Sequence, residues 1–203
     1  MRRLTLKEIL DAIQMRYPYP HGYTDQQIVS ILNDVQRRIF RTLYKVESLE
    51  KQDIFANLPF YPIPCSPDAI ISVSVFGHEY PHQNVKYEPQ ERYYYHAEQG
   101  YIGIYPTPQE TVTCGLAIAY YREPQPLKVE DEEDFNTIPE LDSAWHDLLV
   151  ERACLKLAEI ARDHDMVTTF TISVNRLEDE YKRSKIARPV KIKDVYGIRR
   201  GMQ

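Results

Sequence analysis

Residues 92–109 read RYYYHAEQGYIGIYPTPQ, and this stretch decides the fold class. Three consecutive tyrosines lead into a short segment that ends at Gly100, and a second alternating run stops at Pro106 and Pro108. Two strand-like runs joined by a short turn that contains glycine predict a β-hairpin. Proline lacks the backbone N–H that a sheet ladder needs, so the two prolines predict the end of the strand. Because both ends of the chain carry helical patterns instead, we expect an α+β fold.

The period-two pattern continues on both sides of the hairpin, from about residue 54 to residue 124. It is visible in FYPIP (60–64), IISVSVFGHEY (70–80) and TVTCGLAIAYYREP (111–124). Alternation of this kind is typical of half-buried strands. In the last segment it places five side chains on one face: Val112, Cys114, Leu116, Ile118 and Tyr120. We expect four or five antiparallel strands with short connections and no helical crossover.

Helical patterns precede the strands. Residues 5–8 (TLKE) and 24–27 (TDQQ) have the spacing of a capping box, in which a threonine hydroxyl and a later Glu or Gln bind backbone N–H groups at a helix start. The second box begins a helix with apolar residues every three or four positions: Ile28, Ile31, Leu32, Val35, Ile39 and Leu43. Three arginines, Arg37, Arg38 and Arg41, lie off this stripe, on the side expected to face water.

Two more helices are predicted after the strands. Residues 137–140 (TIPE) have a helix-start pattern, with proline in the first turn. The apolar face that follows consists of Leu141, Trp145, Leu148, Leu149, Ala153, Leu157 and Ile160. A last helix, from about residue 166 to 184, is marked by Phe170, Val174, Leu177 and Tyr181.

The predicted architecture is a four-helix bundle-like core with an inserted antiparallel β lobe and an extended C-terminal tail. Either helix pair alone has too little apolar surface to be stable, so the four helices are expected to pack together. The predicted segments are a helix pair (1–50), the β lobe (51–125), an acidic linker (126–137), a second helix pair (138–186) and a basic tail (187–203).

No convincing active site is visible. His164 lies between Asp163 and Asp165, which could form a small metal site, but a solvated helix end explains the three residues as well. Glycines are spread singly, so there is no phosphate-binding loop. The three cysteines lack metal or redox spacing and are expected to be reduced thiols. We expect a protein that is not an enzyme, with no cofactor and no metal.

The net charge and the tyrosine content of the chain favour a protein that contacts other proteins. The chain has 203 residues and a net charge of −5, which argues against a protein that coats nucleic acid over its whole surface. It contains sixteen tyrosines against six phenylalanines and one tryptophan. Tyrosine suits interfaces because it combines a large rigid ring with a hydroxyl, although half-wet sheets also use it. No signal peptide or membrane span is recognisable, so synthesis and assembly in the cytoplasm are expected.

The tail mixes cations with apolar side chains, a composition that suits an extended segment docking onto another protein. The residues concerned are Arg188, Val190, Lys191, Ile192, Lys193, Val195, Tyr196, Ile198, Arg199 and Arg200. The alternative is a nucleic-acid-binding module that uses this tail together with Arg37, Arg38 and Arg41.

The order of these features resembles the head-to-tail adaptor (connector, or tail accessory) proteins of tailed bacteriophages. The resemblance covers nearly the whole chain: LTLKEILDAIQMRYP, YTDQQIVSILNDVQRRIF, FYPIP, GYIGIYPTP, a strand ending in YYREP, and the late helices IPELDSAWHDLLVERACLKLAEIARDHD and FTISVNRLEDEYKRS. The strongest part is GYIGIYPTP followed by the YYREP strand end and the helix that begins with IPE.

The resemblance implies a structural virion protein that forms a ring of twelve copies beneath the portal and extends the DNA channel. Its implied partners are the portal ring, a tail (nozzle or tail-completion) protein and further copies of itself. DNA would pass without specific binding, and no membrane is involved. The tail residues named above would grip the portal. Tyr93, Tyr94, Tyr95, Tyr101 and Tyr105 would face neighbouring subunits or the tail. The β region is large for the smallest, all-helical adaptors, which favours podophage-like or larger forms.

Overall fold

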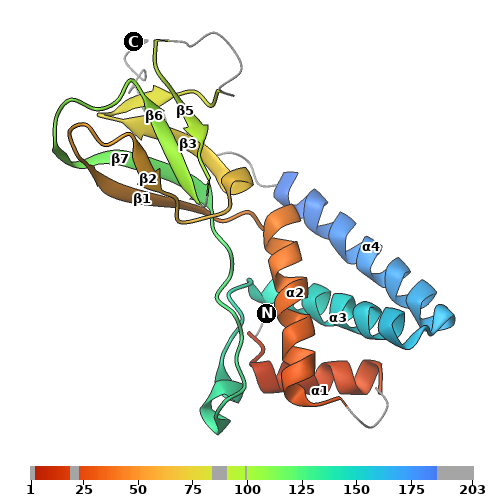
Figure 1. Ribbon diagram of the computed structural model, residues 1–203. Helices are drawn as coiled ribbons and strands as arrows, with labels where there is room; N and C mark the ends of the chain where they lie inside the picture. The colour runs from red at the N-terminus through yellow and green to blue at the C-terminus, as the bar shows by residue number, and fades with distance from the viewer. Residues whose placement is uncertain (1–2, 19–22, 84–90, 99, 187–203) are drawn as a thin grey trace, which may run out of the picture.

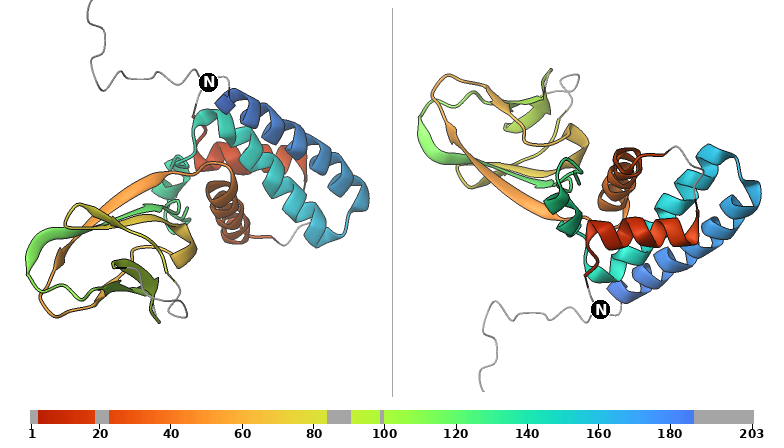
Figure 2. Two further views of the ribbon diagram at one scale, coloured as in Figure 1. Left: turned by 90° about the horizontal axis from the view of Figure 1, so that it is seen from above. Right: turned by 90° about the horizontal axis from the view of Figure 1, so that it is seen from below.

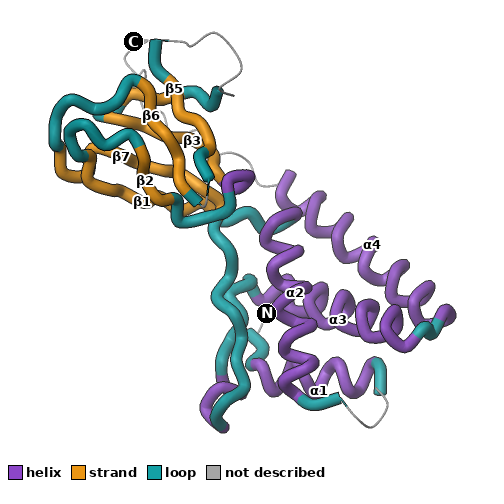
Figure 3. The backbone as a smooth tube through the Cα atoms, viewed as in Figure 1, coloured by secondary structure: helices purple, strands orange, loops and turns teal. Residues whose placement is uncertain are grey.

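The computed structural model describes residues 3–18, 23–83, 91–98 and 100–186, which form a helical lobe and a β lobe joined by a narrow neck (Figure 1). The tube in Figure 3 shows that helices and strands are almost completely separated between the two lobes. This confirms the α+β class. The helices are α1 (Leu6–Arg16), α2 (Asp25–Thr42), α3 (His146–Ala161) and α4 (His164–Ile186). The strands are β1 (Glu47–Ile54), β2 (Phe60–Pro62), β3 (Ile70–Val75), β4 (His78–Tyr80), β5 (Tyr93–His96), β6 (Tyr101–Tyr105) and β7 (Val112–Tyr121).

The first two helices begin as predicted. Both capping boxes are present, with Thr5 paired to Glu8 and Thr24 paired to Gln27. The predicted stripe of α2 faces the core, where Ile28, Leu32 and Ile39 are fully buried.

All four helices contribute to one apolar core, but the predicted four-helix bundle is not confirmed. Figure 2 shows α2 nearly end-on while α1, α3 and α4 lie lengthwise, so α2 crosses the other helices instead of running alongside them. The central helix is α3, which packs against α1, α2 and α4. It buries three consecutive residues, Leu148, Leu149 and Val150. Consecutive residues point to different sides of a helix, so α3 needs neighbours on several sides.

The β lobe consists of two sheets, with strand orders β1-β7-β3-β4 and β2-β6-β5. All pairings within them are antiparallel. The sheets enclose a separate core of ten buried residues that shares no member with the helical core. The described residues contain seven strands, so the predicted four or five was too few. The main omission is β1, whose sequence ESLEKQDI is almost entirely polar and gives no apolar alternation.

The hairpin is confirmed, since β5 pairs with β6 through Tyr93–Tyr105 and Tyr94–Ile104. Gly100 has a φ of 80°, which a residue with a side chain rarely adopts. Pro106 directly follows β6, in agreement with the predicted strand end, and Pro62 is likewise the last residue of the edge strand β2.

Cys114 does not share a face with Leu116 and Ile118 as predicted, because those two residues are buried and Cys114 is exposed. The register of β1 against β7 shifts between Gln52, which pairs with Leu116, and Ile54, which pairs with Val112. Cys114 lies between those two partners in β7 and has a φ of 52°. Its N–H donates to Asp53 Oδ1 at 2.8 Å, and its side chain is exposed. The irregularity breaks the alternation on which the prediction relied.

The predicted helix start at residues 137–140 is wrong. A 3-10 turn at Ser143–Trp145 leads into α3, which begins at His146. Tertiary contacts occupy the predicted start: the carbonyl of Thr137 accepts the N–H of Leu6 at 2.8 Å, and the carboxylate of Glu140 binds Arg122 at 2.6 Å.

The segment predicted as an acidic linker is attached to the helical lobe. The side chain of Asn33 binds both the N–H and the carbonyl of Leu127, at 2.8 and 2.9 Å, and Leu127 is buried. The acidic run forms a 3-10 turn at Glu132–Asn136. The backbone N–H groups of Glu130 and Asp131 donate to Asp134, which lowers the pKa of that carboxyl.

Candidate assembly interface

The three-stranded sheet carries an exposed group of aromatic rings on its outer side. We call this group the aromatic face, and it consists of Phe60, Tyr93, Tyr95, Tyr101 and Tyr105. The pairing register places these residues on one side, because Tyr93 is opposite Tyr105, while Phe60 and Tyr95 are both opposite Gly103. Phe60, Tyr101 and Tyr105 are 45%, 43% and 44% exposed. Such a group of exposed rings is typical of a protein contact surface.

Ring contacts order this face. Tyr93 stacks on Tyr105 with centroids 5.0 Å apart, and Phe60 meets Tyr95 edge to face at 6.4 Å. Gly103 leaves the space for Tyr95, because a Cβ at that position would lie 2.1 Å from the Tyr95 ring. Tyr93 also lies 6.1 Å from Tyr95, centroid to centroid, so four of the five rings of the aromatic face form one chain of contacts.

The structure brings together four of the five tyrosines predicted as an interface and separates the fifth. Tyr94 points to the opposite side of β5, into the core of the β lobe, and is only 7% exposed. Burial raises the pKa of its phenol. The period of two along a strand requires this separation, since Tyr93 and Tyr95 lie on one face and Tyr94 on the other. Phe60, contributed by a different strand, was not predicted as part of the surface.

Exposed apolar residues also occur in the loops at the end of the β lobe away from the helices (Figure 1). Phe55 and Leu58, between β1 and β2, are 50% and 41% exposed, and Phe76, between β3 and β4, is 43% exposed. Phe76 has a φ of 52° and precedes Gly77, with a φ of 79°. Sequence reasoning did not single out these residues, although the Phe-Gly pair between two alternating runs is a signal for a tight turn that exposes its side chains.

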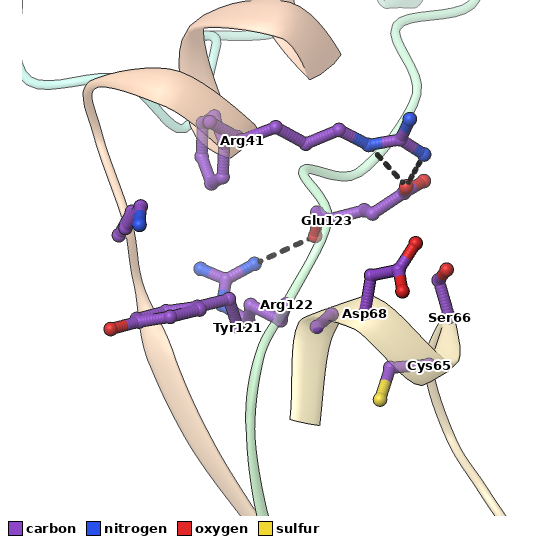
Figure 4. Close-up of a pocket in the computed structure, with 10 residues that line it drawn as sticks. Arg41, Cys65, Ser66, Asp68, Tyr121, Arg122 and Glu123 are labelled. Atoms are coloured by element: carbon purple, nitrogen blue, oxygen red, sulfur yellow. Dashed lines mark hydrogen bonds and ion pairs between the residues drawn. The ribbon is translucent and has the colours of Figure 1, made fainter. Parts of the chain in front are cut away.

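The neck between the lobes contains a cavity of about 310 Å³ (Figure 4). Phe40, Arg41 and Lys45 line it from the helical side, and the turn that carries Ser66 and Asp68 lines it from the β lobe. Arg41 Nε donates to Glu123 Oε1 at 3.1 Å, and the Lys45 ammonium lies 5.0 Å from the centre of the Tyr121 ring.

Two of the three α2 arginines predicted for nucleic-acid binding are paired with acids of this chain. Arg37 forms an ion pair with Asp34, and Arg41 forms one with Glu123. Arg38 is exposed on the same helix. These pairings weaken the alternative of a nucleic-acid surface on α2, because a carboxylate already faces two of the three guanidinium groups.

The three residues considered for a metal site lie at a helix start. Asp163 Oδ1 accepts the N–H of Met166 at 3.2 Å, while His164 and Asp165 are exposed. In the described part of the chain, no group of three or more His, Cys, Asp or Glu side chains is placed to hold a metal ion. Of the free cysteines, Cys154 is buried, and burial raises the pKa of its thiol to about 12.

His146 has a structural position that the sequence did not reveal. It is buried at the start of α3, its Nδ1 accepts the N–H of Leu4 at 3.0 Å, and its Nε2 lies 3.0 Å from the carbonyl of Leu141. An acceptor nitrogen carries no proton, so the ring is neutral and Nε2–H donates to Leu141. Burial lowers the pKa of His146. The imidazole thus joins the N-terminal segment to α3.

The residues predicted to grip the portal, Arg188 to Arg200, lie outside the described residues. Within the described residues, none of the helices is long and apolar enough to cross a membrane.

Comparison with known proteins agrees with the resemblance that the sequence suggested. Among curated proteins, none matches this chain. The model of one protein family, the SU10 adaptor protein family, matches residues 4–190, which cover both lobes and the neck. The chain therefore belongs to the SU10 adaptor protein family, a family of phage head–tail adaptors.

Proposed function

We propose that twelve copies of this protein form a ring beneath the portal, join the capsid to the tail, and extend the channel through which DNA passes. The family match over residues 4–190 carries the proposal. Membership in this family implies a structural role and association with portal and tail proteins in the virion. The ring, its stoichiometry and the portal contact are the proposed steps beyond it.

The division of the molecule into two lobes supports this function. A subunit that lies between two different assemblies needs separate surfaces for them, and the two lobes have separate cores. The helical lobe ends at Ile186, from which residues 187–203 continue. We assign this tail to the portal contact, because its cations and apolar residues together suit docking onto a protein groove.

The aromatic face is assigned to the contact with a neighbouring subunit or with the tail protein. In a ring, each copy reuses the same two patches in a heterologous contact. Exposed, mutually packed rings are suited to such a contact because they bury a large area while losing little side-chain freedom. This assignment keeps Tyr93, Tyr95, Tyr101 and Tyr105 and adds Phe60. Tyr94 contributes by supporting the sheet from the inside.

Light scattering of the purified protein, with and without the portal ring of the same phage, tests the proposal. The full chain is expected to join the portal ring, and a chain cut after Ala187 is expected to remain free. If neither form associates with the portal, the proposed portal contact is wrong.

Two matched tail variants separate a protein groove from a charge-driven contact. One replaces Val190, Tyr196 and Ile198 with serine, and the other replaces Arg188, Lys191 and Arg200 with glutamine. Loss of portal binding in both variants supports docking in a groove. Loss in the charge variant alone, together with binding of the full chain to DNA that falls steeply with salt, would favour nucleic acid instead.

A further inference from the structure

The neck is the place where the molecule lacks a packed core. Val46 is partly buried against the helical core, and so is Tyr44, whose ring lies 5.8 Å from Trp145. Strand β1 begins one residue after Val46. The segment that connects α2 with β1 therefore passes directly from the helical core to the core of the β lobe, with no apolar cluster of its own between them.

The segment that follows β7 returns to the helical lobe beside the segment that precedes β1. Arg122, which directly follows β7, donates its N–H to the carbonyl of Val46 at 3.0 Å, so the two crossing segments pair there. Beyond that point the segment that follows β7 is fixed to the helical lobe. Arg122 binds Glu140 at 2.6 Å, Arg41 binds Glu123, and Gln36 donates to the carbonyl of Gln125 at 3.1 Å. The boundary between the lobes is therefore confined to residues 46–47 and 121–122.

Across this boundary the lobes face each other over the 310 Å³ cavity instead of packing tightly. Figure 4 shows the turn that contains Asp68 on one side and Arg41, bound to Glu123, on the other. Lys45 also lines the cavity. Within the described residues, no ion pair joins Asp68 to either cation. Glu123 lines the same cavity and already binds Arg41, so the attraction on Asp68 comes mainly from Lys45. A carboxylate and an ammonium that line one cavity attract each other, so movement of the turn toward Lys45 is favourable.

We infer that residues 46–47 and 121–122 form a hinge about which the β lobe swings, and that Asp68 draws it closed against Lys45. Each lobe moves as a unit because it keeps its own core, so among the described residues the backbone conformation changes in the two crossing segments. Closure re-aims the aromatic face relative to the helical lobe. The hinge is a property of the single chain and does not depend on ring formation.

Spin-label distances across the neck test this hinge. One label replaces Glu110 in the β lobe and the other replaces Asp165 in the helical lobe, since both are exposed. Cys65 and Cys114 are replaced by serine, and Cys154 stays unlabelled because it is buried. A pair of spin labels within the helical lobe, at Asp11 and Asp165, gives the width of the distance distribution that is expected without a hinge. We expect a broader distance distribution across the neck than within the lobe.

Charge variants test the closing contact. Asp68→Lys is expected to shift the distribution across the neck toward its open end, and Asp68→Asn to shift it less. High salt should move the unmodified chain in the same direction, because it screens exposed charges. Glu159→Gln, which removes an exposed ion pair within the helical lobe, is the matched control and should change nothing.

Two results would overturn the inference. A neck distribution as narrow as that within the helical lobe excludes the hinge. A broad distance distribution across the neck that changes neither with Asp68→Lys nor with salt excludes closure by Asp68. Far-UV circular dichroism of each variant verifies that both lobes remain folded.

Discussion

The helical lobe and the β lobe differ in how many of their large apolar side chains are exposed. In the helical lobe the large apolar side chains are mostly enclosed, and the core draws on all four helices and on Leu127 of the linker. In the β lobe, eight of the twelve exposed large hydrophobic side chains of the described residues lie between Leu49 and Tyr105. Because exposed apolar area is costly to keep in water unless a partner covers it, the difference favours a contact surface on the β lobe.

The largest expected effect tests whether the aromatic face and the β-lobe core are separate. Tyr94→Ala removes a buried ring and should destabilise the β lobe by about 3–5 kcal/mol. Tyr101→Ala removes a ring of similar size from the exposed face and should cost under about 1 kcal/mol. Amide hydrogen exchange of β3, β6 and β7 measures both. Equal costs would mean that the two sides of the hairpin do not differ as described.

The independence of the two cores is tested next. Leu149→Ala, in the middle of α3, should lower the stability of the helical lobe by about 2–5 kcal/mol. Trp145 is the one tryptophan and lies in the helical core, so its fluorescence reports this lobe during denaturation. Amide exchange in the β lobe should stay unchanged. The matched variant Ile118→Ala should do the reverse, and a shift of both lobes by either variant would break the comparison.

His146 provides a smaller effect that belongs to the helical lobe alone. His146→Ala leaves the N–H of Leu4 and the carbonyl of Leu141 without their partner, with an expected cost of about 1–3 kcal/mol.

The same residue predicts a pH dependence of definite sign. Its pKa is lower in the folded chain than the ordinary value of 6.5. Below pH 6.5 the unfolded chain therefore binds more protons, so the stability of the helical lobe should fall as pH falls toward the folded-state pKa. Denaturation followed through Trp145 at pH 7.5 and pH 5 measures this. In His146→Gln that part of the pH dependence should disappear; if it persists unchanged, another group causes it.

The smallest effect concerns the order of the aromatic face. Gly103→Ala places a Cβ against the Tyr95 ring and forces the half-buried side chain to move, at an expected cost of about 1 kcal/mol. The portal contact of the tail should be unaffected, while contacts made through the aromatic face should weaken. If contacts through the face keep their strength, the packing of Tyr95 is unimportant for docking.

The sequence was informative wherever a local pattern and the tertiary contacts agree. The capping boxes at Thr5 and Thr24 were recognisable because their hydrogen bonds join residues only three positions apart. The β5–β6 hairpin was recognisable because a short turn with Gly100 fixes which strands pair. The basic and apolar tail, and its assignment to the portal, stay predictions.

Several errors share one cause, which is contact with distant residues. Strand β1 is polar and is defined by its pairing with β7, more than fifty positions away. The helix pattern at residues 137–140 was overridden because Leu6 and Arg122 use Thr137 and Glu140. The candidate surface changed likewise, since Phe60 joined it from another strand and Tyr94 left it.

The sequence by itself determined the α+β class, the two helical capping boxes and the central hairpin, because local periodicity and turn chemistry act over a few residues. Tertiary structure alone decided that the molecule has two cores, that α2 crosses the other helices, and that five rings from three strands share an exposed face. These features depend on which distant segments come together, and hydrophobic burial, which drives that choice, has no direction along the chain.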